Sequence, residues 1–228
     1  MMEKYIVPLL NEFVSDENRP YHRFRSWQHC YKFFASELDD SNKEMGALHL
    51  AFYLASWGMY RGSTFLLQND YTIHLDVVEI LYANKNSDYT EFAQILKVSK
   101  LISAHYENNA HPNATERVVP SDTLITKILL GTTGCIPAYD RFFKTGLQYT
   151  RLPQTFSSRG FEQLNAYYAQ NEEVFRRFSK DEIPKMKLID MYFWKLGFEV
   201  EKIKREYKGI DKQGILEKLE RKYWTHHD

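Results

Sequence analysis

The stretch ILLGTTGCIPAYDRFF, residues 128–143, carries the strongest local signal in the chain. Apolar residues at helical spacing run into a Gly-Thr-Thr-Gly turn, and Pro137 then precedes a second amphipathic segment that has an Asp in its first turn. Proline suits the first turn of a helix, because its missing N–H would have no intrahelical partner there. Gly131 and Gly134 permit positive φ, so the pattern predicts a tight hairpin between two helices. Exposed N–H groups of this turn and the following helix N-terminus would favour an anion such as a nucleic-acid phosphate.

Helical periodicity continues in both directions from this stretch, and no convincing alternating strand series is present, so we expect an all-α fold. Residues 43–60 are apolar on nearly all sides, as is typical of a buried central helix. Further helices are expected from near Asp88 to Tyr106, over 122–130 with a cap at Ser121, from Pro184 to about Gly197, and along the C-terminal stripe of Leu216, Leu219 and Tyr223.

Two polar stretches, 107–120 and 150–160, predict long loops on either side of the quoted motif. Residues 121–149 then form a compact helix–hairpin–helix unit within one all-α domain, 1–228. The loop over 107–120 is a candidate boundary between two helical lobes.

Composition restricts the class of protein. The 228 residues are 43% hydrophobic and 15% aromatic, as expected for a globular chain that can bury a core. Lys plus Arg equals Asp plus Glu at 30 each, which argues against binding to nucleic acid by bulk charge but leaves room for a local patch. Sixteen Tyr and fifteen Phe could supply stacking surfaces for bases as well as core.

The chain shows no sign of a disulfide framework, a metal site or a membrane segment. Cys30 and Cys135 lack metal-site spacing, a predicted loop lies between His105 and His111, and His226-His227 lies near the C-terminal end of the sequence. The start has no secretory apolar region and no run of 18 apolar residues occurs. We therefore expect a cytoplasmic, soluble protein that has no metal, no cofactor and no membrane partner.

A family resemblance gives these features a chemical meaning. The segment LLGTTGCIPA (129–138) resembles the helix–hairpin–helix element of base-excision DNA glycosylases, in which a Gly-hydrophobic-Gly turn grips the DNA backbone. TKILLGTTGCIPAYDRFFKTGL (126–147) is most similar to an outlying bacterial group, related to oxoguanine-glycosylase-like proteins, with a Thr-Lys pair and a Pro-x-x-Asp. ASWGMYRGSTFLL (55–67) also resembles that group's Trp-Gly-x-x-Arg-Gly element, and small anti-phage glycosylases acting on modified cytosine are among its members.

The resemblance implies an N-glycosyl hydrolase that flips a modified or damaged base out of double-stranded DNA and excises it, leaving an abasic site. Repair and anti-phage defence both remain open, and a monomer is expected. The turn departs from the family's usual Gly-Val-Gly. Ile136 or Pro137 stands where lyase-type members carry a Lys, which favours a monofunctional enzyme, although Lys127 of the Thr-Lys pair stays a catalytic candidate.

Two carboxylates compete for the catalytic position. A fixed carboxylate stabilises the positive charge that builds on the sugar as a glycosidic bond breaks, and it can position the attacking water. Asp140 carries over onto the Pro-x-x-Asp position. Asp190, in LIDMYFWKLG (188–197), resembles the superfamily's Asp-x-x-x-x-Arg-x-x-x-Leu-Gly stretch but lies far along the chain from Gly134. Asp140 is preferred, and the plain alternative is that it only favours a helix N-terminus.

The remaining site candidates follow from their neighbourhoods in the sequence. Contacts to the DNA backbone are expected from the turn and from the mild positive excess after it: Gly131, Thr132, Thr133, Gly134, Arg141 and Lys144. Aromatic walls and polar groups for a flipped base are expected from two segments, 57–68 and 22–29: Trp57, Tyr60, Arg61, Ser63, Gln68 and Trp27. The alternative for each of these is an aromatic core residue or a surface side chain.

Two rival functions need fewer or different residues. RFRSWQH (23–29) resembles the Arg-x(4–6)-His motif of HEPN ribonucleases, with Arg23 and His29 supporting attack by the RNA 2′-OH, usually in a dimer. A non-catalytic helical interaction module would explain the apolar helices but not the turn, Pro137 and Asp140.

Overall fold

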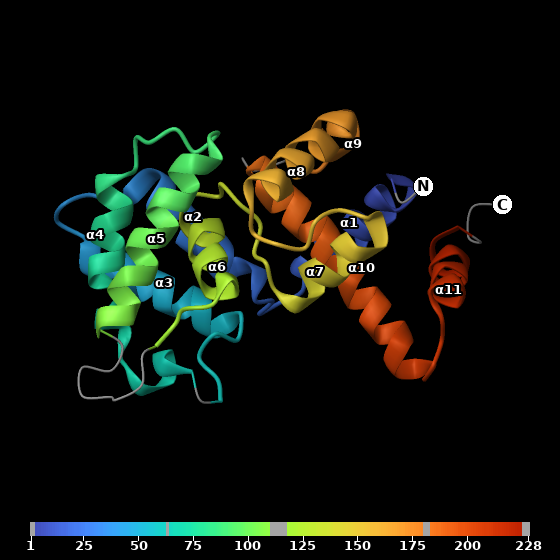
Figure 1. Cartoon of the computed structure of the whole chain (residues 1–228), viewed down its shortest axis with the longest axis horizontal. Helices are drawn as coiled ribbons and strands as arrows, with labels where there is room; N and C mark the ends of the chain where they lie inside the picture. Colours follow the sequence, from blue (N-terminus) through green and yellow to red (C-terminus); the bar gives the residue numbers. More distant parts are fainter. Residues whose placement is uncertain (1–2, 63, 110–117, 180–182, 225–228) are drawn as a thin grey trace. The chain divides into compact units, whose positions relative to one another are not determined.

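The structure is a computed structural model that describes residues 3–62, 64–109, 118–179 and 183–224. All regular secondary structure in these ranges is helical, which confirms the all-α fold (Figure 1). The chain forms two compact units: a central unit, Arg19–Ala138, and a terminal unit made of Met1–Asn18 and Tyr139–Asp228. The candidate boundary at 107–120 was wrong, because the division between the two units falls between Ala138 and Tyr139.

In its described residues, the central unit contains five α-helices and three shorter helical segments. In chain order they are α2 (Phe24–Lys32), the π-helix η2 (Phe33–Glu37), α3 (Lys43–Ser56), the 3-10 helices η3 (Phe65–Gln68) and η4 (Tyr71–His74), α4 (Leu75–Ala83), α5 (Phe92–Asn109) and α6 (Asp122–Thr132).

Helix α3 lies at the centre of this unit and packs on α2, α4 and α6. Gly131 of α6 lets the two helices approach, because a Cβ there would lie 2.3 Å from a ring carbon of Tyr53. The indole N–H of Trp27 in α2 donates to the Leu130 carbonyl of α6 at 3.0 Å. Trp27 is buried, so this bond ties two helices together inside the core.

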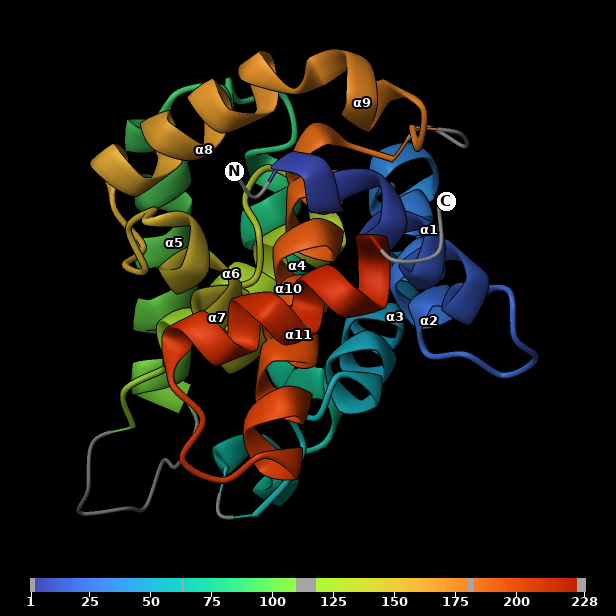
Figure 2. The same ribbon diagram turned by 90° about the vertical axis from the view of Figure 1, so that its right-hand side faces the viewer.

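The terminal unit is built around the long helix α10 (Lys185–Glu206), which contacts the other major helices of the unit (Figure 2). These are α1 (Ile6–Glu17), α7 (Arg141–Thr150), α8 (Ser158–Gln170) and α11 (Lys212–Trp224). The short helix α9 (Glu172–Arg176) packs on α1 and α8.

Helices α7 and α10 make the closest crossing in this unit. A Cβ on Gly146 of α7 would lie 2.1 Å from the Phe193 carbonyl oxygen, and one on Gly197 of α10 would lie 1.8 Å from that of Phe142. Gly197 therefore allows the backbones of α7 and α10 to touch in the middle of α10. The expectation that the helix ends near Gly197 was wrong, because packing rather than chain termination explains this glycine.

The other helix predictions agree with the structure to within a few residues. The Ser121 hydroxyl caps α6 by accepting from Leu124 N, as expected. The helix expected over 43–60 stops at Ser56, because Gly58 has a positive φ of 74° and turns the chain. The helix expected from Asp88 begins at Phe92, after a turn in which Asp88 accepts from Thr90 N.

Candidate functional site

The Gly-Thr-Thr-Gly turn is a helix C-terminus. Gly131 and Thr132 belong to the last turn of α6, and only Gly134 has a positive φ, of 65°. The backbone N–H groups of Thr133 and Gly134 both donate to the Leu129 carbonyl, at 3.0 and 2.9 Å. The expectation that these N–H groups are free to bind a phosphate was therefore wrong, because both are already hydrogen-bonded within the C-terminal cap of α6.

The segment after this turn is not a tight hairpin. Residues 134–140 lie outside any helix, so Pro137 belongs to the connection, and α7 begins only at Arg141. The predicted start of the second helix at Pro137 was therefore wrong by four residues. This connection also carries the chain from the central unit back into the terminal unit, whose second segment begins at Tyr139.

Asp140 is the N-cap residue of α7. Its backbone is extended, and its side-chain oxygen Oδ1 accepts a hydrogen bond from the Phe143 N–H at 3.0 Å. The side chain is half-buried. Tyr139 packs against the rings of Phe143 and Phe156, which anchors the residue directly before the carboxylate. The carboxylate is thus held in one orientation by its own helix.

Two side chains that were predicted to contact the DNA backbone follow Asp140 in the first turn of α7. Arg141 is exposed, with its guanidinium over the ring of Phe142, and Lys144 is half-buried. Asp140, Arg141 and Lys144 therefore share the N-terminal end of one helix. This is the only group of predicted site residues that the terminal unit assembles within its described part.

Asp190, the rival carboxylate, is buried in α10. Its Oδ2 lies 2.8 Å from the ammonium of Lys187, one helical turn earlier, and the two side chains are only 5% and 2% exposed. A buried pair of this kind is strongly destabilised when one partner is removed, because the other charge is left in a low-dielectric environment. Its position gives Asp190 an evident structural role.

Several predicted residues of the central unit meet at the end of α3. The ammonium of Lys127, only 5% exposed, donates to the Trp57 carbonyl oxygen at 2.9 Å. The guanidinium of Arg23 lies over the Trp57 ring, 4.4 Å from its centroid. Arg23, Trp57 and Lys127 thus form a cation–aromatic cluster, in which one face of the indole is already covered by a guanidinium.

Tyr60 belongs to a buried hydrogen-bonded chain. Its hydroxyl lies 2.7 Å from His74 Nε2, and His74 Nδ1 lies 2.6 Å from the Tyr106 hydroxyl. Burial lowers the pKa of His74 to about 3, with a further lowering from the nearby His105. Burial also raises the pKa of Tyr60 to about 12, followed by a smaller effect of Asp70. The neutral imidazole therefore donates to one tyrosine and accepts from the other.

The other predicted pocket residues lie in different environments. Arg61 and Gln68 are exposed, and Trp27 is buried with its N–H bonded and its ring stacked on Tyr31. Ser63 lies outside the described residues, as do His111, His226 and His227. We therefore assign Trp27 to the core of the central unit.

The ribonuclease motif is spread around α2. Arg23 directly precedes the helix and covers Trp57, while His29 is exposed on its last turn. Residues six apart on a helix point roughly 120° away from each other. Arg23 and His29 of one chain therefore do not form a pair on one face.

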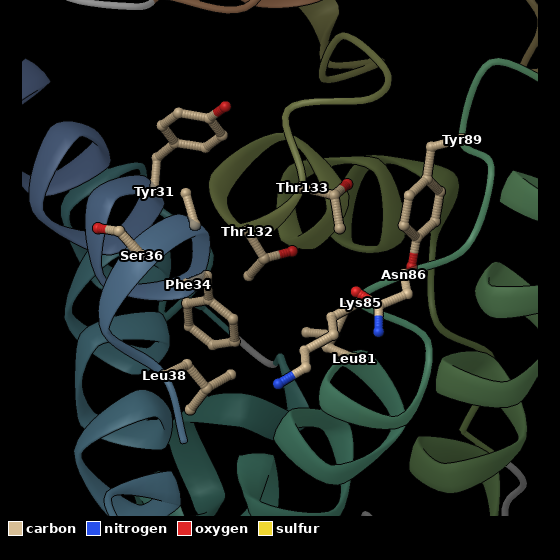
Figure 3. Close-up of a pocket in the computed structure, with 11 residues that line it drawn as sticks. Tyr31, Phe34, Ser36, Leu38, Leu81, Lys85, Asn86, Tyr89, Thr132 and Thr133 are labelled. Carbon is tan, nitrogen blue, oxygen red and sulfur yellow. The ribbon is translucent and has the colours of Figure 1, made fainter.

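The central unit holds a cavity of about 440 Å³ that the sequence did not predict, apart from Thr132 and Thr133 (Figure 3). Its walls come from α2, η2, the connection between α4 and α5, and the end of α6, and comprise Tyr31, Phe34, Ala35, Ser36, Leu38, Leu81, Lys85, Asn86, Tyr89, Thr132 and Thr133. A signal was present in YANKNSDY (82–89), where tyrosines bracket a polar loop. A π-helical turn in the wall, with Leu38 N bonded to Phe33 O at 2.8 Å, is a further feature often found at functional sites.

No protein-family model, curated protein or solved structure matches this chain. Among the residues that the structure describes, no helix combines the length and the apolar character needed to cross a membrane. Within the same ranges, His, Cys, Asp and Glu side chains form no group of three or more that could hold a metal ion.

Proposed function

We propose that the protein is a monofunctional DNA glycosylase in which Asp140 is the catalytic carboxylate. The observation that carries the proposal is the position of Asp140 as N-cap of α7, with one carboxylate oxygen bonded to the Phe143 N–H. The family resemblance of residues 126–147 and the basic side chains of Arg141 and Lys144 beside the carboxylate support it.

The reaction is hydrolysis of the bond between C1′ of a deoxyribose and a base nitrogen. As this bond breaks, the base leaves with the electron pair and positive charge develops on the sugar. A carboxylate whose orientation is already set stabilises that charge without reorganisation during the reaction, and it can orient the water that adds to C1′. The water supplies a hydroxyl to C1′ and a proton to the departing base, which leaves an abasic site.

Asp140 suits this task better than Asp190. Asp190 is almost fully buried against the Lys187 ammonium, so a DNA sugar would have to displace a buried ion pair to reach it. Asp140 is half-buried at a helix end that also presents Arg141 and Lys144 for phosphate contacts.

The test uses purified full-length protein and end-labelled duplexes: ordinary DNA, DNA with oxidised purines, and phage DNA with modified cytosines. We expect alkali-dependent strand breaks on one of the modified substrates. Asp140→Asn should lower the rate of strand breakage by a factor of about 100 or more, because the substitution removes the fixed negative charge. Asn is as good an N-cap as Asp, so this variant should keep its fold and its DNA binding.

The matched control is Asp211→Asn. Asp211 is a second capping aspartate of the terminal unit, and its Oδ1 accepts from Gly214 N at 2.8 Å. Full activity in this variant, together with loss in Asp140→Asn, would assign the effect to the chemistry of Asp140 rather than to helix capping. Equal activity in both variants and the wild type would refute the role of Asp140, and the absence of breaks on every duplex would refute the glycosylase.

A further inference from the structure

The cavity of the central unit has aromatic walls on opposite sides. Figure 3 shows Tyr31 and Tyr89 on opposite sides of it, with Thr132 and Thr133 between them. Its volume of about 440 Å³ lies within the range of small-molecule sites, roughly 300–1,000 Å³. An aromatic side chain in the wall suits a planar heterocycle, because stacking on aromatic side chains accepts any base face.

The polar groups of the cavity favour a particular hydrogen-bonding pattern. The hydroxyls of Thr132 and Thr133 donate to the Ile128 and Leu129 carbonyls at 2.8 and 2.9 Å. Their protons are committed, so toward a ligand these oxygens act as acceptors. They also lie at the C-terminal end of α6, where the helix dipole is negative. This side of the cavity therefore favours an amino group on the ligand.

The opposite side supplies donors. Asn86 carries an exposed side-chain amide, and Lys85 adds an ammonium that rests over the Tyr82 ring, 4.0 Å from its centroid. The Tyr89 hydroxyl oxygen is buried, and in the described part of the chain it finds no hydrogen-bond partner. A buried unsatisfied hydroxyl is destabilising, and a ligand atom that accepts from it would remove this cost.

The loop that carries Asn86 and Tyr89 is held in place before any ligand binds. Ser87 Oγ accepts from the Gln94 amide of α5 at 2.8 Å, and Tyr89 N donates to Ser87 O at 3.0 Å. The Asp88 carboxylate accepts from both the N–H and the hydroxyl of Thr90. Such preorganisation lowers the entropy lost on binding.

We infer that this cavity binds a nucleotide whose base carries an exocyclic amino group beside a ring acceptor, as in cytosine or adenine. The base stacks on Tyr31, its amino group donates to the hydroxyl oxygens of Thr132 and Thr133, and its ring acceptor meets Asn86 and the hydroxyl of Tyr89. Lys85 at the wall supplies a positive charge for the phosphate. Thymine presents a carbonyl oxygen where the threonines require a donor, so it should bind poorly.

The test is an NMR titration of the full-length protein with dCMP and dTMP, and with single-stranded (dC)4 and (dT)4. We expect the cytosine ligand to bind at least about tenfold more tightly than its thymine counterpart, since a mismatched polar group loses a hydrogen bond and leaves a buried acceptor unpaired. Preference seen with mononucleotides identifies a free nucleotide as a sufficient ligand. Preference seen only with the tetranucleotides identifies an unpaired DNA strand as the source.

Three variants locate the site. Asn86→Ala and Tyr89→Phe should each weaken binding of the preferred cytosine ligand roughly three- to tenfold. Tyr89→Phe should also keep or raise the melting temperature of the free protein, because it deletes a buried unpartnered hydroxyl. Tyr71→Phe is the matched control: its hydroxyl donates to Glu44 outside the cavity, so binding should not change.

The inference is overturned by equal affinity for cytosine and thymine ligands, by no binding of any of the four, or by unchanged binding in both cavity variants. These outcomes are independent of the glycosylase assay. If the protein binds (dC)4 but excises no base, the nucleotide site stands and the proposed function fails. If it excises a base but shows no such binding, the proposed function stands and the nucleotide site fails.

Discussion

Replacing Gly197 by Ala tests the crossing on which the position of Asp140 depends. Helix α7, which Asp140 caps, lies against α10 through Gly146 and Gly197. The added Cβ would lie 1.8 Å from the Phe142 carbonyl oxygen, 2.7 Å from its carbon and 2.9 Å from Gly146 N. All three atoms are backbone, so no side-chain rotation can relieve the overlap, and the two helices must separate by more than about 1 Å.

The expected cost is large. Overpacking a core by one methyl group usually costs about 1–3 kcal/mol, and here the neighbours are two rigid helix backbones, so we expect at least about 3 kcal/mol. For a chain of this length each kcal/mol lowers the melting temperature by about 2–4 °C. Gly197→Ala should therefore melt at least about 6 °C below the wild type.

Urea and thermal unfolding followed by circular dichroism measure this loss. Gly209→Ala is the matched control: Gly209 has a φ of 79° but open space around it, so only backbone strain of about 1–2 kcal/mol applies. A free energy of unfolding for Gly197→Ala within about 1 kcal/mol of the wild type would refute the close crossing. If the proposed function holds, a separated α7 also predicts slower base excision at temperatures where the variant is still folded.

Three further predictions concern single side chains. Asp190→Asn should lose about 3–5 kcal/mol, because it leaves the Lys187 ammonium buried without its carboxylate, and chemical unfolding that shows less than 1 kcal/mol would contradict the buried pair. Asp140→Ala should lose about 1 kcal/mol with its cap while Asp140→Asn loses little, a difference that paired melting curves resolve; equal losses would argue against capping. The pKa of His74 falls from 6.5 to about 3 on folding, so below about pH 6.5 the unfolded chain binds a proton that the folded chain does not. Stability should therefore decrease by up to about 1.4 kcal/mol per pH unit as pH falls toward 3, and a His74→Gln variant with the same acid slope would refute this assignment.

The helices and their caps could be predicted because they depend on residues close together in the chain. Ser121 caps α6 as expected, and the apolar spacing of 92–106 and 43–60 marks most of α5 and all of α3. Capping and amphipathic periodicity are local effects, so they survive whatever the rest of the chain does.

The roles of two glycines could not be predicted from the residues around them in the sequence. Gly131 and Gly197 look in the sequence like a turn residue and a helix terminator, yet both lie inside helices, against Tyr53 and the Phe142 carbonyl. A glycine can be required by backbone angle or by the approach of a distant segment, and only the packed structure distinguishes the two.

The features of the candidate site likewise separate into local ones and ones that depend on tertiary structure. Sequence alone singled out Asp140 and placed it close to the start of a helix, because the Pro-x-x-Asp pattern and the preceding break are local. Tertiary structure alone decided that Asp190 is buried with Lys187, and that Tyr31, Tyr89 and Thr132 line one cavity. Whether a side chain is buried and hydrogen-bonded depends on which distant segments pack together. The residue spacing within one stretch of sequence does not determine that packing.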